Sequence, residues 1–160
     1  MKKAIIWFVV GGLLGGAAGF AVGLFVYPYI FLADIVAAEA PPDPSKTVVA
    51  TGTFIHADPD DPVHYGKGKV TVYADAVRLE PDFEVGPGPK FHVYLVPKAP
   101  IKSSGDVKDT MYVDLGRLRA FKGAQNYAIP KGVDLKKYPT VLIWCEAFGV
   151  LISPATLKYK

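Results

Sequence analysis

The sequence predicts an all-β fold, an antiparallel β-sandwich or barrel-like domain preceded by one N-terminal transmembrane helix. Three observations carry this prediction: an uncharged apolar run at residues 4–32, short β-type segments after residue 46, and turn residues between those segments. The 16 Gly and 14 Pro suit a fold with many turns. We therefore divide the chain into a transmembrane anchor at 1–32, a Pro-rich linker at 33–46 and an extracytoplasmic β domain at 47–160.

The N-terminal run is long enough to cross a membrane, for which about 20 apolar residues suffice. Lys2 and Lys3 precede the run, so the positive-inside rule keeps the N-terminus in the cytoplasm. Tyr27 and Tyr29 flank Pro28 near the far end, where aromatic side chains prefer the interface and proline can end the helix. We expect a single-pass protein of the cell membrane with its C-terminal domain outside the cytoplasm.

A cleaved signal peptide is the alternative to this anchor. Ala38, Glu39 and Ala40 form a small-x-small match to a cleavage site. The apolar run is, however, about twice the usual length of a signal h-region. Pro41 follows the site directly and disfavours cleavage, because it has no N–H and a rigid ring. These two features favour an uncleaved anchor.

Small residues recur along one stripe of the expected helix. This small-xxx-small spacing lets two membrane helices approach closely and predicts a homodimer. The alternative is that glycine is simply common in membrane helices. The stripe consists of Gly11, Gly15, Gly19 and Gly23.

β-Branched and aromatic residues gather in short segments along the rest of the chain. The clearest alternation is at 91–96, where Phe91, Val93 and Leu95 alternate with other side chains. Gly, Pro, Asp and Ser separate the segments, and a short helical turn is expected at 133–137. The expected strands are 47–56, 69–73, 91–96, 111–115, 125–129, 140–148 and 150–153.

Composition excludes several classes of protein. The 18 Lys+Arg and 15 Asp+Glu leave no basic block for nucleic acid, and 51% hydrophobic residues exclude disorder. A single cysteine excludes an internal disulfide and a zinc site built on two thiolates. The chain has no GxSxG, HExxH or phosphate-binding loop, and no His follows Cys145 as in blue-copper sites. We assign no metal-ligating residue.

The loop at 56–64 concentrates charge, with three carboxylates and two imidazoles in nine residues. Asp58, Asp60 and Asp61 could hold calcium, which prefers clustered oxygen ligands. The loop lacks the glycine and the distant glutamate of an EF-hand, and prolines stiffen it. A solvated turn is the simpler interpretation.

Cys145 lies in the most apolar expected strand. Alternation places Ile143 and Cys145 on one face, and Trp144 and Glu146 on the other. A free cysteine in such a strand is ordinarily a small core residue. An exported protein with one thiol also raises the possibility of a reactive thiol, and His64 and His92 are then the candidate neighbours.

Read in order, a series of motifs resembles the DM-thirteen family, also called the electron-transfer DM-thirteen domain, including its membrane-anchored bacterial members. The resemblance covers about residues 51–157. The motifs are Gly52-x-Phe54, His64-x-Gly66-x-Gly68-x-Val70, Arg78-Leu79 before Phe83, Gly88-Pro89-x-x-x-Val93-Tyr94-Leu95, Val113-Asp114-Leu115-Gly116-x-Leu118, Gly123-x-Gln125-x-Tyr127-x-Ile129-Pro130, Tyr138-x-x-Val141-x-Ile143-Trp144-Cys145-x-x-Phe148-x-Val150 and Ala155-x-Leu157.

The resemblance implies a β-rich extracytoplasmic module with a redox role. It matches the family's cysteine to Cys145 and its histidine to His64, so these two form the expected redox or ligand pair. His92, the second candidate neighbour from the residues themselves, is a further candidate ligand. The cysteine would act as a bare thiol or hold a prosthetic group, with haem or copper as candidates. The chain departs from the pattern in an insertion at 59–62 and in Ile152-Ser153-Pro154.

Two functions follow from these residues. The first is a membrane-anchored redox or electron-transfer module centred on Cys145. The second is a non-catalytic binding or structural module of the cell envelope, in which Cys145 belongs to the core. The redox function requires a coloured protein or an accessible thiol, and the binding function requires neither. The protein partner in either case is unidentified.

Overall fold

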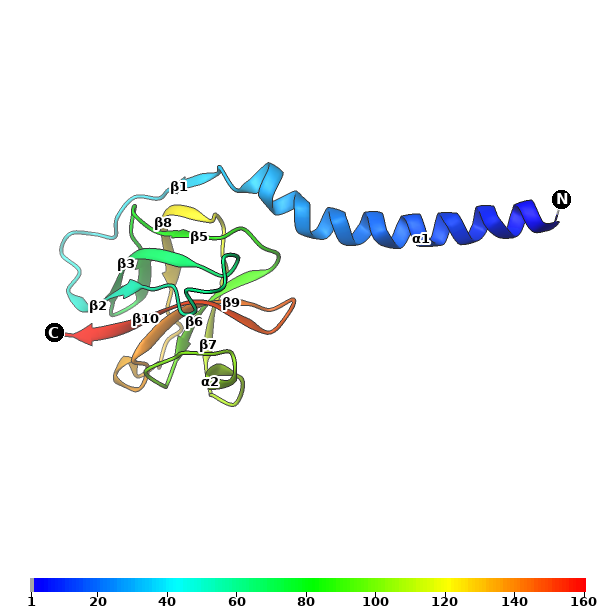
Figure 1. The fold of residues 1–160 in the computed structure, drawn as a ribbon. Coiled ribbons are helices and arrows are strands. Elements are labelled where there is room, and N and C mark those ends of the chain that lie inside the picture. The colour runs from blue at the N-terminus through cyan, green and yellow to red at the C-terminus, as the bar shows by residue number, and fades with distance from the viewer. Residues whose placement is uncertain (1) are drawn as a thin grey trace.

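The computed structural model describes residues 2–160. Helix α1 (Lys2–Tyr27) continues into one π-helical turn, η1 (Pro28–Leu32), and the two project from the β domain as a single rod (Figure 1). The helix is long and apolar enough to span a membrane, and those of its side chains that the structure describes lie exposed. This agrees with the sequence prediction of one membrane helix.

Ten strands form one sheet after the helix. Their order across the sheet is β1-β8-β4-β3-β2-β10-β9-β6-β7, with β5 paired to β3 and β8 (Figure 1). Every pairing is antiparallel except that of β1 with β8. The strands are β1 (Val36–Ala38), β2 (Val48–Phe54), β3 (Gly66–Tyr73), β4 (Ala76–Leu79), β5 (Glu84–Val85), β6 (Phe91–Val96), β7 (Val113–Arg117), β8 (Lys122–Ala128), β9 (Thr140–Cys145) and β10 (Val150–Tyr159).

The sheet curls around its main hydrophobic core. Strands β7 and β8 stand far apart in the hydrogen-bonded order and yet contact each other. One buried cluster accordingly draws side chains from both halves of the sheet, among them Val70, Val93, Tyr127 and Ile143. The predicted β fold is thereby confirmed.

A second buried cluster covers the other side of β6 and β9. It includes Tyr94, Leu142 and Trp144, together with Val107 from helix α2 (Gly105–Lys108). Leu142 and Trp144 thus face away from Ile143, as strand alternation predicts. The two clusters give β9 a buried face on each side.

Part of the segment predicted as a linker adds a strand to the sheet. Residues Val36–Ala38 pair with β8, and the Glu39 carboxylate accepts hydrogen bonds from the Asn126 backbone N–H at 2.8 Å and from Arg119 at 2.9 Å. Arg78, only 4% exposed, donates to the backbone carbonyl groups of Glu39 and Ala40. The connection between helix and domain is therefore docked, because these polar groups bind it.

The expected strands correspond to β2, β3, β6, β7, β8, β9 and β10, with shifted ends. Strands β1, β4 and β5 and helix α2 were not expected. Strand β10 also runs beyond the expected end at residue 153, because a register shift between Leu151 and Ser153 accommodates Pro154. The expected turn at 133–137 is the 3-10 helix η2 (Leu135–Lys137).

The second cluster generates a stability prediction. Trp144 is 7% exposed, so Trp144→Ala should lower the free energy of unfolding by about 3–5 kcal/mol through lost burial and a residual cavity. Chemical denaturation of detergent-purified protein measures this change. A loss below about 1 kcal/mol would contradict the packing role of the indole ring.

Candidate functional site

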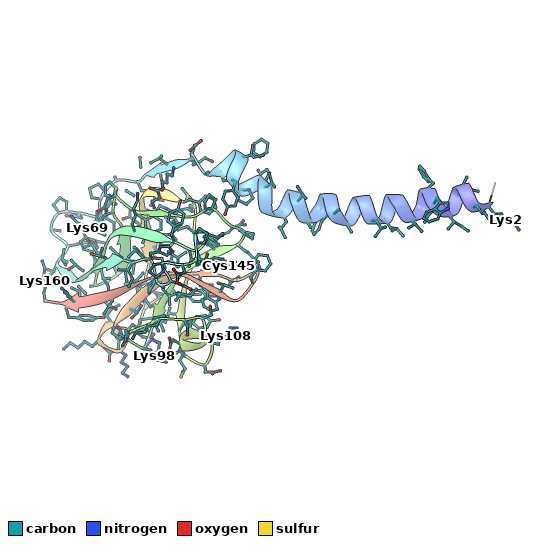
Figure 2. The ribbon with its side chains drawn as sticks, in the orientation of Figure 1. Lys2, Lys69, Lys98, Lys108, Cys145 and Lys160 are labelled. Carbon is teal, nitrogen blue, oxygen red and sulfur yellow. The ribbon has the colours of Figure 1, made fainter. Side chains whose placement is uncertain are left out.

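Cys145 ends strand β9 inside the main core. It pairs with Phe91 of β6 and is 2% exposed, and its thiol donates a hydrogen bond to the Pro89 carbonyl oxygen, with 3.3 Å between sulfur and oxygen. Figure 2 shows Cys145 within the β domain. The thiol is therefore fixed in place and shielded from solvent.

The surroundings of the sulfur favour the protonated thiol. Burial raises the pKa of Cys145, the backbone N–H groups of Phe148 and Ala147 partly oppose this, and the charge of Glu146 adds to the rise. The pKa lies above its usual value as a result. Since the thiolate is the nucleophile and metal ligand, this setting opposes both activities.

The structure places His64 in a different group from Cys145. The His64 ring nitrogen Nδ1 lies 2.6 Å from Asp61 Oδ2, beside a small pocket of about 210 Å³ that Ser103 and Leu151 also line. Among residues 2–160, the hydrogen bonds of the Cys145 sulfur involve backbone groups and no imidazole.

The acidic loop around His64 uses its carboxylates to hold its own backbone. Asp58 accepts the N–H of Asp60, and Asp61 accepts the N–H groups of Val63 and His64. The hydrogen bond from the His64 ring, followed by those two N–H groups, lowers the pKa of Asp61 to about 2. These contacts are those of an ordered turn.

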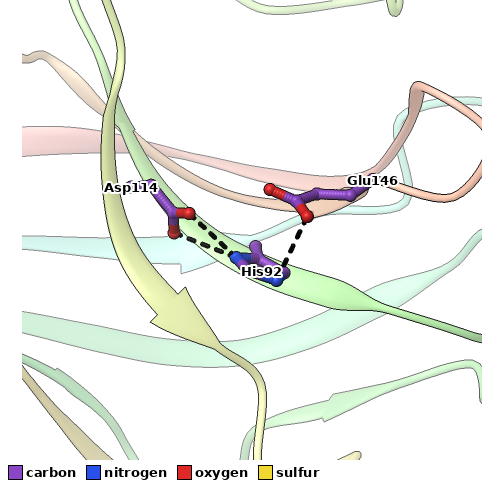
Figure 3. A group of neighbouring side chains, drawn as sticks. All are labelled: His92, Asp114 and Glu146. Atoms are coloured by element: carbon purple, nitrogen blue, oxygen red, sulfur yellow. Dashed lines mark hydrogen bonds and ion pairs between the residues drawn. The ribbon is translucent and has the colours of Figure 1, made fainter.

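His92 lies on the opposite face of the sheet from Cys145. It pairs with Trp144, and its ring fits between two carboxylates: Nδ1 lies 3.0 Å from Asp114 Oδ2, and Nε2 lies 3.4 Å from Glu146 Oε2 (Figure 3). Strands β6 and β7 and the turn after β9 each supply one member. Residue reasoning gave His92 as a candidate neighbour of Cys145, and one motif of the resemblance contains Asp114, but neither brought Asp114 and Glu146 to His92.

Aromatic rings extend this group. The Tyr94 hydroxyl donates to Glu146 Oε1 at 2.9 Å. The Tyr94 ring stacks on Tyr112, with centroids 4.3 Å apart and an angle of 6° between the planes, and it lies 6.4 Å from Trp144. Tyr94 is 2% exposed and Tyr112 is 44% exposed, so the stack leads from the interior to the surface. We call these six residues, including His92 and Asp114, the aromatic–acid cluster.

Burial and the Glu146 carboxylate set the protonation of Tyr94. Desolvation raises the pKa of its phenol, and the hydrogen bonds with Glu146 and Tyr112 raise it further. Tyr94 therefore cannot give up its proton as an ordinary acid near neutral pH. It can give the proton to Glu146 along the existing hydrogen bond when its ring loses an electron.

The donor atoms of His92, Asp114 and Glu146 are close enough to share a metal ion. In the structure both ring nitrogens already face carboxylates, and Lys90 Nζ lies 3.7 Å from Glu146 Oε2. These contacts form one polar network around the imidazole. Glu146 joins it to Tyr94, because its other oxygen accepts from the Tyr94 hydroxyl.

Haem or copper bound through Cys145 does not fit this arrangement. The sulfur is committed to backbone partners, and neither His64 nor His92 shares a hydrogen bond with it. Four cavities of about 210 to 660 Å³ within residues 2–160 are lined by other residues than Cys145. Cys145, His64 and His92, which the sequence suggested as ligands, therefore belong to three different groups of contacts.

Residues 60–157 match the family model described as Electron transfer DM13. This match spans more than half of the chain. The chain belongs to the DM13 family. No curated protein and no solved structure matches it.

The DM13 domain of this chain contains a site that sequence reasoning missed in part. Alternation identifies Trp144 and Glu146 as one face of a strand, but the partners on β6 and β7 depend on register. A usable signal was present: Tyr94, Trp144 and Glu146 are chemically active side chains at alternating positions of two apolar segments.

Burial of the thiol generates a labelling prediction. In the native protein Cys145 should react far more slowly with a chromogenic disulfide reagent than after unfolding, because it is 2% exposed and its pKa is raised. Complete unfolding should release one reactive thiol per chain. Cys145→Ser supplies the background. Equal native and unfolded rates would show an accessible thiol.

Proposed function

We propose that this chain is a membrane-anchored electron-transfer module whose DM13 domain lies outside the cytoplasm. The family supports the electron-transfer role, and helix α1 supports the anchor. Lys2 and Lys3 support the orientation, since basic residues next to a membrane helix stay on the cytoplasmic side.

The observation that carries the mechanism is the hydrogen bond from Tyr94 to Glu146 beneath the exposed ring of Tyr112. A one-electron oxidant at the surface takes an electron from Tyr94 through the stacked ring of Tyr112. The phenolic proton moves at the same time to Glu146, which leaves a neutral tyrosyl radical and a neutral carboxylic acid. A one-electron reductant returns the electron, and the proton returns to the Tyr94 oxygen.

His92 and Asp114 position the proton acceptor in this mechanism. The imidazole lies between the carboxylates of Asp114 and Glu146, and it holds Glu146 Oε2 while Oε1 accepts from Tyr94. Lys90 adds a positive charge beside the same carboxylate. These contacts hold the Glu146 carboxylate in place for the transfer.

Cys145 is the second redox-active residue of the proposal. It follows Trp144 in β9, so electrons reach it through the ring stack and need no path for diffusing reagents. The Pro89 carbonyl oxygen orients its S–H group but is too weak a base to take the proton, so the thiol keeps it. His64 lies in the separate group around Asp61, and we include it only as a residue that supports that loop.

A structural role of Cys145 is the second candidate. Its burial in the main core among Phe91, Val93 and Ile143 favours that role. The domain would then act as a binding or structural module, and replacing the sulfur would leave any redox signal unchanged.

The proposed orientation predicts the behaviour of a C-terminal fusion. A reporter enzyme that is active only outside the cytoplasm should be active when fused after Lys160, because Lys2 and Lys3 hold the N-terminus inside. Replacing both lysines by Glu should lower this activity. Activity of a cytoplasm-only reporter at the same position would reverse the proposed topology.

The proton-coupled step predicts a tyrosyl radical. Full-length protein in detergent, oxidised by a photogenerated one-electron metal complex, should give a tyrosyl signal in electron paramagnetic resonance. Tyr94→Phe should remove most of that signal, and Glu146→Gln should reduce it because an amide cannot take the proton. The matched control is Tyr127→Phe: the Tyr127 hydroxyl is buried and donates to the Gln125 side chain, an amide, at 2.8 Å.

The same experiment separates the two roles of the cysteine. If Cys145 exchanges electrons with the stack, Cys145→Ser should prolong the life of the radical. An unchanged lifetime would assign Cys145 to the core, and an unchanged signal in Tyr94→Phe would overturn the mechanism.

A further inference from the structure

A cavity of about 660 Å³ lies where the membrane helix meets the β domain. Its walls come from the last turns of α1, from η1, and from the segments before β6 and after β7. The cavity therefore adjoins the C-terminal end of the one helix that is long and apolar enough to cross a bilayer. None of the residues of the aromatic–acid cluster lines it.

One side of the cavity is apolar. Phe20 and Leu24 contribute from the helix at 74% and 41% exposure, and Leu118 and Phe121 contribute from the β domain. Gly23 opens the helix surface between the first two, since a Cβ there would meet nothing within 4 Å. This apolar wall follows the axis of α1, and the acyl chains of a bilayer run roughly parallel to a helix that crosses it.

The other side carries three cations and no carboxylate. Arg119 is already bound to Glu39, with 2.8 Å between Nη2 and Oε1, and Lys90 lies 3.7 Å from Glu146. Arg117 is exposed and, within residues 2–160, its side chain has no hydrogen bond or ion pair. An exposed guanidinium without such partners can donate two parallel N–H hydrogen bonds to a phosphate.

We propose that the cavity binds one acidic phospholipid of the membrane that α1 crosses. The phosphate contacts Arg117 and Lys90, and an acyl chain lies along Phe20 and Leu24. Charge complementarity selects an anionic headgroup, and the position at the end of the helix selects a lipid over a soluble anion. The two proposals share Lys90, which also lies 3.7 Å from Glu146, so Arg117→Gln is the variant that tests lipid binding without touching the electron-transfer residues.

The test uses full-length protein in neutral detergent and native mass spectrometry, with phosphatidylglycerol and phosphatidylcholine titrated separately. We expect one tightly bound phosphatidylglycerol per chain. Arg117→Gln should weaken its binding about fivefold, and the double variant with Lys90→Gln roughly 25-fold. Phosphatidylcholine binding should be weaker in the wild type and unchanged in the variants.

The matched control removes two charges elsewhere. Lys108 and Lys160 are exposed and lie away from α1 in the view of Figure 2, so Lys108→Gln with Lys160→Gln should bind phosphatidylglycerol like the wild type. Equal binding of the two lipids, no bound lipid, or an equal loss in the control would overturn the proposal. Tight binding of inorganic phosphate in the absence of lipid would overturn the proposal and assign Arg117 and Lys90 to a soluble anion instead.

Discussion

The antiparallel pairing of β6 with β9 is the constraint on which the rest of the domain depends. The register runs without interruption from Phe91 opposite Cys145 to Val96 opposite Thr140. It directs Cys145 into the main core, and it brings His92 opposite Trp144 on the other face. A slip of one residue would exchange the two faces, so the buried thiol and the aromatic–acid cluster exist only in this register.

The segment before β6 couples this register to the membrane side of the domain. The Pro89 carbonyl oxygen accepts the Cys145 thiol, and the Lys90 carbonyl oxygen accepts the N–H of Glu146 at 3.1 Å. The Lys90 backbone adopts a φ of 55°, which ordinary residues rarely take, and the side chains of both residues line the cavity at the end of α1. Two residues that line the cavity are thus hydrogen-bonded directly to the residues at the end of β9.

The sequence predicts the local structure of the site better than its assembly. Alternation within one strand places Cys145 inward and Trp144 outward, and the structure has both. Alternation cannot predict that Asp114 and Glu146 lie beside His92, because those contacts depend on how three separate segments pair. The resemblance matched Cys145 with His64, and the hydrogen bonds of the structure hold those two in different groups.

The same limit explains why strand β1 was not expected within residues 33–46. Residues 33–46 look like a linker because prolines interrupt them, yet the buried charge of Arg78 needs acceptors, and the carbonyl groups of Glu39 and Ala40 supply them. Burial pushes the pKa of Glu39 up, but its hydrogen bonds with Asn126 and Arg119 outweigh that effect and lower the pKa. The docking of the connection is thus favoured above the ordinary pKa of a glutamate and weakens as acid protonates Glu39.

This docking has a consequence for an electron-transfer module on a membrane. A free linker would let the domain rotate away from the bilayer, whereas a strand paired to β8 keeps the end of α1 next to the segments around Pro89 and Leu118. Under the proposed function, the exposed ring of Tyr112 would then keep a fixed orientation relative to the membrane as well. A partner held in the same membrane would meet that ring at a set height, and this arrangement would favour repeated exchange of single electrons over capture of diffusing reagents.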